Sequence, residues 1–555
     1  MDVAGNALIS VYDKTGIEDF ASNLHQLNWQ IYASGGTYNA IAEAGIPASN
    51  ISELVGGEAI LGHKVVSLSR EIHAGLLADL SSPQDMQELR KLNIPLINLA
   101  CVDMYPLEKE LANPKATATS VRANTDIGGP TILRSAAKGH RIVVSSVEQR
   151  QQVIDWLKAG RPNEDVFLDK LATQAEYEVA RYTLQLALYL GGNSVSGSLA
   201  KIHSKTKYGE NPQQTDAALY ADNRVAVDPL GLDQFTHVKG WEKSYINLTD
   251  IDRLIQTSTH IAAGFDRNFN EVPAIAVGVK HGNACGAGVA KTHAEAVRKM
   301  LDGDTRAIFG GVVMINGEID KEIAEILMHH SMNGDKKRLL DGIIGASVTN
   351  EAIEILTRNK LRIVTNPSLG SLSEASLDHD RRPRPVRGGN LAQPNYAYVS
   401  DLSADYIQKS GQLTEQQKRD LILAWAIGST SNSNTVTLVK DGMLIGNGVG
   451  QQDRVGAGQL AIARTTIEMP ELEEVDGKLI MTVTLDKQKL EGASAYSDSF
   501  FPFSDAPMLL AKAGIKAILT SSGSVRDKEI INYLSSTGVS MVMVPDRIGR
   551  GFYGH

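Results

Sequence analysis

The chain has 555 residues, of which 42% are hydrophobic and 21% charged, a composition typical of folded globular proteins that excludes a disordered or collagen-like chain. Its formal net charge of −9 argues against a general nucleic-acid binder and against a protein of anionic membrane surfaces. The two cysteines, Cys101 and Cys285, exclude a disulfide framework, and neither an 18-residue apolar run nor a signal peptide is apparent. We therefore expect a cytoplasmic protein of several domains that binds neither nucleic acid nor membrane.

The first part of the chain alternates between strand and helix patterns. Short apolar runs predict strands at residues 7–12, 29–33, 96–102 and 142–145, and one of the helices between them is predicted at 38–44. This alternation is typical of an α/β domain with a doubly wound parallel sheet. A helical stretch over residues 165–190 ends in Gly191-Gly192-Asn193-Ser194, where we expect a domain boundary.

The remainder of the chain is again mixed α and β. Strands are predicted at residues 273–279, 307–315, 435–439, 443–445, 518–520 and 539–544. A polar stretch rich in arginine and proline, residues 377–387, is expected to join two lobes. No repeat is visible in the sequence itself.

A glycine turn follows the second predicted strand and precedes a helix. Ser34, Gly36 and Thr37 lie in this turn, whose free N–H groups and helix dipole favour a phosphate. Lys14, just after the first strand, would add a positive charge at the same edge of the sheet. The alternative is a plain strand-to-helix turn, so the pattern leaves phosphate binding and a structural turn open.

A second polar cluster follows the strand that ends near residue 102. Asp126, Gly128 and Gly129 would bring a carboxylate and backbone donors together, and Lys138 a cation, in one pocket. Tyr105 is a further candidate for that pocket. The alternative is a glycine-proline loop capped by the aspartate, with the lysine and the tyrosine in structural roles.

The densest polar segment lies at the end of the predicted strand 273–279. His281 offers a proton acceptor near neutral pH, and Lys280 a cation for a developing oxyanion. The alternative is a pair of surface residues without a function. The His293-Ala294-Glu295 segment matches half of a zinc-deaminase signature, but no Pro-Cys-x-x-Cys follows, so we expect no zinc. A Walker A loop is also missing, so ATP use has no support.

These segments, in this order, resemble the family of bifunctional AICAR transformylase/IMP cyclohydrolase enzymes over nearly the whole chain. The matching pieces are SVYDKTG, ASGGT, IHAGLL, TDIGGPTILRSAAKGH, KYGENPQQ, VKHGNACG, FGG, VRGGNLAQ, SNTV, GQQDR and SDSFFPFSD. The resemblance implies a methylglyoxal-synthase-like cyclohydrolase domain over residues 1–195. It also implies a transformylase region over residues 196–555, made of two cytidine-deaminase-like α/β lobes without zinc, with a join near 377–395. The expected assembly is a homodimer.

The resemblance also implies the chemistry and the residues that perform it. The transformylase moves a formyl group from 10-formyltetrahydrofolate to AICAR and gives FAICAR, which the cyclohydrolase closes to IMP with loss of water. Implied as catalytic are Lys280, His281 and Asn434 for formyl transfer, and Tyr105, Asp126 and Lys138 for ring closure. The implied substrate-binding positions are Ser10, Lys14, Ser34, Gly36, Thr37, Lys64, Ser67, Gly128, Gly129, Lys207, Tyr208, Gly209, Arg454, Phe500, Phe501 and Asp505. A monovalent cation held by backbone carbonyls would leave no signature in the sequence.

Several positions depart from the family pattern. Val66 stands where the family has a functional lysine and Ser69 where it has a histidine, and Lys64 is a candidate to replace the missing charge. Gln213 replaces a histidine, Lys207 replaces an arginine, Ser429 lies near a position that is usually basic, and the chain ending leaves the counterpart of a terminal arginine open between Arg547 and Arg550.

Two other functions therefore stay open. One is a transformylase whose first domain binds nucleotide but closes the ring weakly or not at all, which Val66 motivates. The other is a purine-nucleotide-binding regulatory protein without activity, against which Lys280, His281 and the FFPF segment argue.

Overall fold

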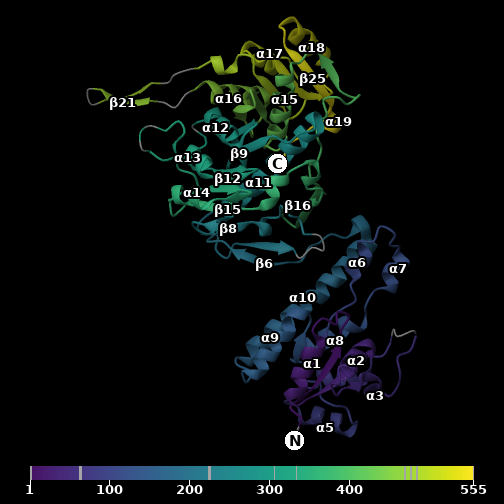
Figure 1. The fold of residues 1–555 in the computed structure, drawn as a ribbon. Helices are drawn as coiled ribbons and strands as arrows, with labels where there is room; N and C mark the ends of the chain where they lie inside the picture. The colour runs from purple at the N-terminus through teal and green to yellow at the C-terminus, as the bar shows by residue number, and fades with distance from the viewer. Residues whose placement is uncertain are drawn as a thin grey trace. The chain divides into compact units, whose positions relative to one another are not determined.

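The computed structural model describes residues 3–553 except 62–64, 223–226, 306, 333, 335, 468–470, 476–477 and 483–485, with backbone only for 193, 222, 471–475 and 478–482. The chain divides into two compact units (Figure 1). Residues 1–201 make up most of the smaller unit, and residues 202–221 and 226–555 form the larger one.

The smaller unit is built on a five-stranded sheet in which every pair of neighbours is parallel. The strand order is β3-β2-β1-β4-β5. The strands are β1 (Gly5–Ser10), β2 (Trp29–Ala33), β3 (Ser49–Asn50), β4 (Leu99–Val102) and β5 (Ile142–Val144). Because a parallel pair needs a crossover connection, a helix lies between consecutive strands of this order. The predicted doubly wound parallel sheet is confirmed.

Helices connect these strands and follow the last of them. They are α1 (Ile17–Gln26), α2 (Gly35–Glu43), α3 (Ile51–Val55), α4 (Arg70–Leu77), α5 (Pro83–Lys91), α6 (Leu107–Leu111), α7 (Ala118–Ala123), α8 (Gly128–Lys138), α9 (Val147–Lys158) and α10 (Glu164–Gly191). The predicted strand 7–12 is too long, since β1 ends at Ser10 and the next N–H, that of Val11, donates to the Thr37 hydroxyl at 3.1 Å. The helix predicted from residue 38 already begins at Gly35, after Ser34 in an extended conformation.

The larger unit contains a twelve-stranded sheet made of two copies of one six-stranded pattern. The full order is β18-β25-β24-β23-β19-β20-β10-β9-β11-β13-β15-β8, and the copies meet where β10 pairs antiparallel with β20. The first copy has β8 (Thr236–Lys239), β9 (Ala274–Lys280), β10 (Asn283–Ala290), β11 (Val312–Ile315), β13 (Gly342–Gly345) and β15 (Arg362–Thr365). The second has β18 (Gln408–Ser410), β19 (Val436–Lys440), β20 (Met443–Gly448), β23 (Ser494–Ser497), β24 (Ala517–Ser522) and β25 (Ser540–Pro545).

The helices repeat in the same order. The first copy carries α11 (Tyr245–Phe269), α12 (His293–Gly303), α13 (Lys321–His329) and α14 (Asn350–Ile355), and the second carries α15 (Glu415–Gly428), α16 (Arg454–Thr466), α17 (Asp505–Lys512) and α18 (Asp527–Ser536). The expectation of no repeat therefore holds for residue identities only. Strand pairing and burial require a pattern of apolar residues rather than particular amino acids, so a structural repeat can exist without a repeat of residue identities.

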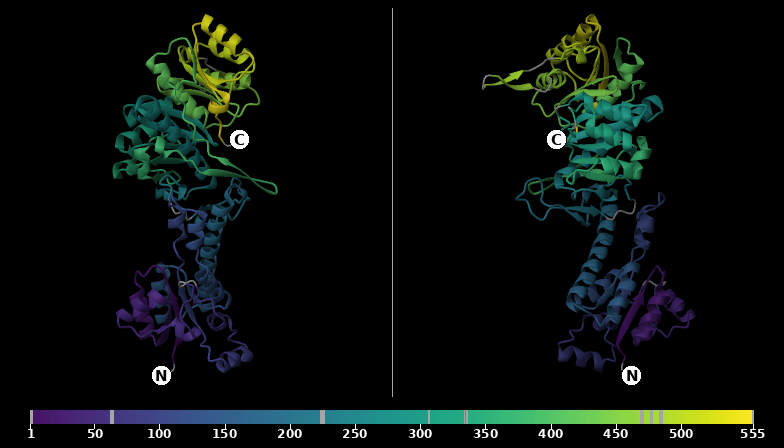
Figure 2. Two further views of the ribbon diagram at one scale, coloured as in Figure 1. Left: turned by 90° about the vertical axis from the view of Figure 1, so that its right-hand side faces the viewer. Right: turned by 60° about the vertical axis from the view of Figure 1, so that its left-hand side comes forward.

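Several two-stranded pairs lie outside this sheet. β16 (Arg381–Val386) and β17 (Gly389–Pro394) form an antiparallel pair whose side chains are nearly all exposed. The sequence predicted a connecting segment there, and this hairpin follows β15, the last strand of the first copy, and precedes β18, the first strand of the second. A second pair, β21 (Glu471–Val475) and β22 (Lys478–Thr482), stands out from the body of its unit (Figures 1 and 2). β6 (Ala200–Lys205) and β7 (Ala218–Asp222) form a third pair.

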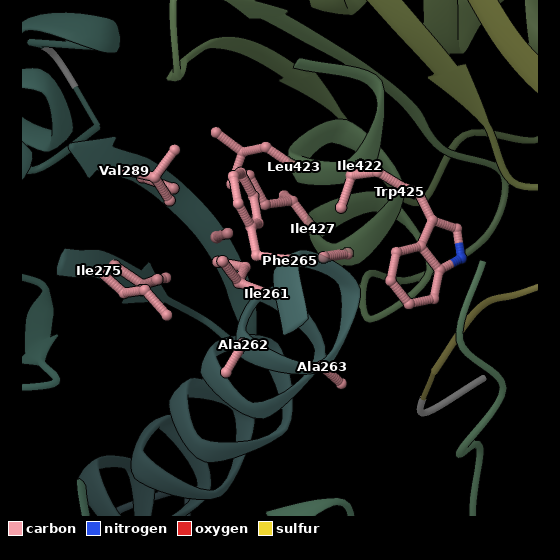
Figure 3. Close-up of a cluster of buried hydrophobic side chains, with 14 of the residues drawn as sticks. Ile261, Ala262, Ala263, Phe265, Ile275, Val289, Ile422, Leu423, Trp425 and Ile427 are labelled. Carbon is pink, nitrogen blue, oxygen red and sulfur yellow. The ribbon is translucent and has the colours of Figure 1, made fainter. Parts of the chain in front are cut away.

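The main core of the larger unit lies where α11 and α15 pack together. Phe265 and Trp425 are among its largest fully buried side chains, and Ile422 lies between the two helices (Figure 3). Gly264 permits this close approach, because a Cβ there would lie 2.8 Å from Ile422 Cγ2. The two copies of the pattern therefore share one core as well as one sheet. Within the described part of the chain, no helix has the length and apolarity to cross a membrane.

Candidate active sites

A sharp hairpin turn between β9 and β10 carries Lys280 and His281. His281 and Gly282 both have positive φ, 54° and 71°, and Lys280 pairs with Asn283 across the turn. A two-residue loop with this backbone is a type I′ turn, which presents its first side chain at the end of the hairpin. His281 is accordingly exposed, and Lys280 Nζ donates to the Phe309 carbonyl at 2.8 Å. The sequence placed both residues correctly at the end of a buried strand.

Asn434 reaches the same region from a different segment. The Asn432 N–H donates to Asn283 Oδ1 at 3.1 Å, which connects the loop before β19 to the residue after the His281 turn. In that loop Asn434 Nδ2 donates to the Gln451 carbonyl at 3.0 Å. Gln451 in turn lies just ahead of α16, which begins at Arg454. The structure thus joins three segments that are more than a hundred residues apart at their extremes.

A buried carboxylate holds these segments together, and the sequence reasoning missed it. Asp498 is fully buried and accepts hydrogen bonds from the Ser433 hydroxyl at 2.6 Å, the Thr435 N–H at 3.0 Å and Arg454 Nη2 at 3.2 Å. Burial raises the pKa of Asp498, while Ser433 and Arg454 favour its charged form. The signal was present, because Asp498 lies in the SDSFFPFSD segment.

The end of the chain runs beside this carboxylate. The Gly551 N–H donates to the Asp498 carbonyl at 3.1 Å, and the Tyr553 N–H donates to the Ser431 carbonyl at 3.1 Å. The guanidinium of the buried Arg253 lies over the Tyr553 ring, 4.6 Å from its centroid. Arg550 is instead ion-paired with Asp546. The terminal residues with described contacts to the site are therefore Gly551 and Tyr553, and neither Arg547 nor Arg550.

In the smaller unit, the predicted phosphate-binding residues come together at the carboxyl ends of β1 and β2. The hydroxyls of Ser10 and Ser34 are 2.7 Å apart, and the Thr37 hydroxyl donates to the Val11 carbonyl at 3.1 Å. Lys14 Nζ donates to the same Val11 carbonyl at 3.0 Å, and Gly36 lies close to its side chain. In parallel α/β sheets ligands bind at this edge, where helix N-termini offer free N–H groups.

Asp126 and its neighbours lie at the N-terminus of α8. Asp126 Oδ1 accepts the Gly129 N–H at 2.9 Å, and the Asp126 N–H donates to the Tyr182 hydroxyl at 2.7 Å. Burial raises the pKa of Asp126, and the N–H groups of Gly129 and Tyr105 oppose that shift. Tyr105, which is 53% exposed, meets the Tyr12 ring edge to face with 5.8 Å between centroids. The aspartate and the turn predicted to bind phosphate therefore open on the same edge of the sheet.

Lys138 lies at the opposite end of α8 from Gly128. It is the last residue of α8, and a helix of 11 residues separates its ends by about 15 Å. Among the contacts of the described residues, none joins Lys138 to Asp126, so their place in one pocket stays a prediction.

Comparisons with known proteins match nearly the whole chain. The family described as "AICARFT/IMPCHase bienzyme" matches residues 136–464, and the one described as "MGS-like domain" matches residues 16–131. The "Bifunctional purine biosynthesis protein PurH" of Staphylococcus carnosus is 32% identical over 97% of this chain and 98% of that protein. Those of Anoxybacillus flavithermus and Halalkalibacterium halodurans are each 34% identical with the same coverage.

This chain belongs to the AICARFT/IMPCHase bienzyme family. The resemblance read from the motifs is thereby confirmed, and so are the MGS-like first domain and the bifunctional enzyme class. Membership favours the bifunctional interpretation over a transformylase alone and over a protein without activity. Among the described residues, no group of three or more His, Cys, Asp or Glu side chains could hold a metal ion.

At the position where the AICARFT/IMPCHase pattern has a lysine, this chain has an apolar residue, and that residue has a packing role. Val66 packs against the core of the smaller unit. Its neighbour Ser67 lies beside the N-terminus of α8, with its hydroxyl 2.8 Å from where a Cβ on Gly128 would be. The substitute cation Lys64 lies outside the described residues. Ser69, at the position of the family's histidine, caps α4 by accepting the Ile72 N–H at 3.2 Å.

The remaining predicted residues of the larger unit lie in two segments of the chain, the one from Phe500 to Asp505 and the connection between β6 and β7. Phe501 is 1% exposed in the core under α16 and α17, Phe500 faces Gly523, and Asp505 begins α17. Lys207, Tyr208 and Gly209 lie in the connection between β6 and β7, together with Gln213. Among the described residues, no hydrogen bond or ion pair joins that connection to the His281 turn.

Proposed function

We propose that this chain catalyses both reactions of its family, in succession. Formyl transfer from 10-formyltetrahydrofolate to AICAR gives FAICAR, and dehydrative closure of FAICAR gives IMP. One observation supports this most strongly: hydrogen bonds through Asn283, Asn432 and Asp498 connect the segments of His281, Asn434 and Arg454.

In formyl transfer, the nucleophile is the 5-amino group of AICAR. Conjugation with the carboxamide-bearing imidazole makes this amine weak, so it must lose a proton as it attacks the formyl carbon. His281 takes that proton, and Lys280 and Asn434 stabilise the negative charge that develops on the formyl oxygen. The C–N bond to tetrahydrofolate then breaks, and a proton returns to the folate nitrogen. Arg454 is assigned to the substrate, together with Lys207, Tyr208 and Gly209, and the Phe500–Asp505 segment to folate and substrate.

In ring closure, the carboxamide nitrogen of FAICAR attacks the formyl carbon and water is lost. Ser10, Lys14, Ser34, Gly36 and Thr37 hold the ribose phosphate at the edge of the parallel sheet. Asp126 and Tyr105 act on the proton transfers that accompany attack and loss of water, with Ser67, Gly128 and Gly129 beside them. We assign Lys138 and Lys64 to this reaction by family position only. A monovalent cation also stays a prediction.

A single incubation of the purified chain with AICAR and 10-formyltetrahydrofolate tests the proposal. Chromatography separates FAICAR from IMP, and we expect IMP to accumulate. If FAICAR accumulates with no IMP above the uncatalysed background, the smaller unit only binds. If neither product forms with correctly folded protein, the chain is a nucleotide-binding protein without transformylase activity.

The Val66→Lys variant then measures how the missing lysine affects the rate of ring closure. In a chain that already produces IMP, we expect it to change the rate of ring closure without changing the rate of formyl transfer. A change in both rates would indicate that replacing a side chain packed on the core disturbs the fold instead.

We further propose a homodimer, by family resemblance. Light scattering after size exclusion should give about twice the monomer mass of 59.8 kDa. A mass of one chain, at protein concentrations at which the enzyme is active, would contradict it.

A further inference from the structure

The larger unit contains two copies of one hairpin turn. In the β9–β10 turn, His281 and Gly282 have φ of 54° and 71°, and in the β19–β20 turn Asp441 and Gly442 have φ of 52° and 74°. A lysine precedes both turns and pairs across them, Lys280 with Asn283 and Lys440 with Met443. Type I′ turns favour Asn, Asp or Gly at the first position and Gly at the second. The second copy follows that preference, and the first has a histidine in its place.

Each turn is held by a buried aspartate from the helix that precedes it. Asp250 on α11 accepts the Gly282 N–H at 2.8 Å, and Asp420 on α15 accepts the Gly442 N–H at 2.8 Å and the Asp441 N–H at 3.0 Å. Each aspartate lies six residues after the residue that caps its helix, Ser244 or Thr414. The two aspartates are 5% and 3% exposed. The same support therefore occurs twice, once under a histidine and once under an aspartate.

We propose that Asp250 is a positioning residue for formyl transfer, which fixes the His281 turn through the Gly282 N–H and stabilises the imidazolium that forms when His281 accepts a proton. The proposal rests on the proposed function, in which His281 takes the proton of the AICAR amine. A carboxylate near an imidazole favours its protonated form, and a fixed backbone holds the ring where the proton is released. Asp420 has no such partner, because Asp441 replaces the histidine, so its role is limited to the turn.

Other charged groups lie near Asp250 and His281 and contribute to the electrostatics there. Arg253 interacts with Asp250 from the same helix, Asp341 from the segment before β13, and His281 from the turn. Lys280 adjoins His281, with its Nζ on the Phe309 carbonyl. Burial raises the pKa of Asp250, whereas the Gly282 N–H, His281 and Arg253 favour its charged form. Of the groups named, Asp250 is the one that is hydrogen-bonded to the turn.

Asp250→Asn tests the proposal in the full chain, and Asp420→Asn is its matched control. Asparagine keeps the size of the side chain and a carbonyl oxygen for the Gly282 N–H, but it removes the charge. One measurement is the pH profile of formyl transfer. The other is an NMR titration of the His281 ring C–H resonance, assigned by its absence in His281→Asn. The titration tests the coupling even in a chain that transfers no formyl group, so failure of this proposal is distinguishable from failure of the proposed function.

In Asp250→Asn we expect kcat to fall about tenfold, with KM for AICAR changed less than about twofold. We expect the acidic limb of the profile and the His281 titration midpoint to move to lower pH than in the parent, because the imidazolium loses its counter-charge. Asp420→Asn should change neither.

Asp250→Glu keeps the charge on a longer side chain and is a second test of the proposal. We expect its His281 midpoint to stay near that of the parent, even where kcat falls. An unshifted midpoint in Asp250→Asn overturns the proposal. So does a midpoint that shifts equally in the glutamate variant, and so does an equal loss of activity in Asp420→Asn.

Discussion

Arg454 Nη2 donates to Asp498 Oδ1 at 3.2 Å, and Asp498 is fully buried while the arginine side chain is 19% exposed. The pair joins the N-terminus of α16 to the loop after β23. The other oxygen of Asp498 accepts from Ser433 and Thr435, in the loop that carries Asn434. One carboxylate therefore fixes two segments of the proposed transformylase site.

We expect Asp498→Asn to destabilise the larger unit by about 3 kcal/mol, because removing one partner of a buried ion pair leaves the other charge unpaired. Urea unfolding of variant and parent measures this difference. Arg298→Gln is the control: the Arg298–Glu322 pair is half exposed on both sides and should contribute less than about 1 kcal/mol. Equal effects of the two variants would contradict a structural role for Asp498.

His281→Asn should reduce kcat of formyl transfer at least about 100-fold and leave the fold intact. Asparagine-glycine is a preferred type I′ turn, so the hairpin keeps its geometry while the proton acceptor is lost. Alanine would be a poorer test, because it lacks the short polar side chain with which asparagine tolerates the left-handed backbone at φ 54°. Asp441→Asn makes the matching change in the second copy and should leave turnover unchanged. Full turnover in a folded His281→Asn would remove His281 from the mechanism.

The residues that these two variants replace differ in how far the sequence predicts their surroundings. The end of a buried strand, followed by His281 and Gly282, predicts a polar turn at a sheet end, and the structure has one. No local pattern records which distant strands become neighbours, so only the family resemblance implied that Asn434 joins it, and Asp498 was missed although it lies in a matching segment. The pairing of β10 with β20 brings these segments together. This pairing joins the two copies of a structural repeat that is not visible in the residue identities.

The smaller unit was more predictable, because a parallel sheet with its ligand edge follows from alternation alone. Ser10, Ser34 and Thr37 met as expected at the ends of neighbouring strands. The place of Lys138 in that pocket stays a prediction, because a short spacing in sequence becomes about 15 Å along a straight helix and no described contact joins it to Asp126. The sequence shows that Val66 departs from the family pattern, but only the three-dimensional structure shows that its side chain packs against the core.

Lys14→Met should weaken ring closure selectively. The Lys14 ammonium lies at the edge of the sheet with Gly36 beside it, where the proposed site binds the phosphate of FAICAR. Loss of a charged hydrogen bond to phosphate should raise KM for FAICAR about 30-fold, which corresponds to about 2 kcal/mol. Lys170→Met, an exposed lysine of α10, is the control. Formyl transfer to AICAR should be unaffected in both variants, and a parallel loss in Lys14→Met would indicate misfolding.

His260→Phe should make the larger unit less sensitive to acid. His260 is 1% exposed between Tyr396 and Trp425, and its Nδ1–H donates to the Gln256 carbonyl at 2.8 Å. Burial lowers the pKa of His260 to about 4 from its ordinary value of 6.5. Between those two values the unfolded chain binds a proton that the folded chain does not, so the stability of the fold decreases as the pH falls from 6.5 towards 4.

At pH 5 that loss amounts to about 2 kcal/mol relative to pH 7, and it should disappear when the titrating group is replaced by phenylalanine. Urea unfolding of parent and variant at both pH values measures the difference. Phenylalanine preserves the ring stacked on Tyr396 but forfeits the bond to Gln256, so its stability at pH 7 should be lower by about 1 kcal/mol. The exposed His203, replaced by glutamine, should leave the acid sensitivity as it is in the parent. If His260→Phe loses as much stability on acidification as the parent does, the buried histidine is not the source of that loss.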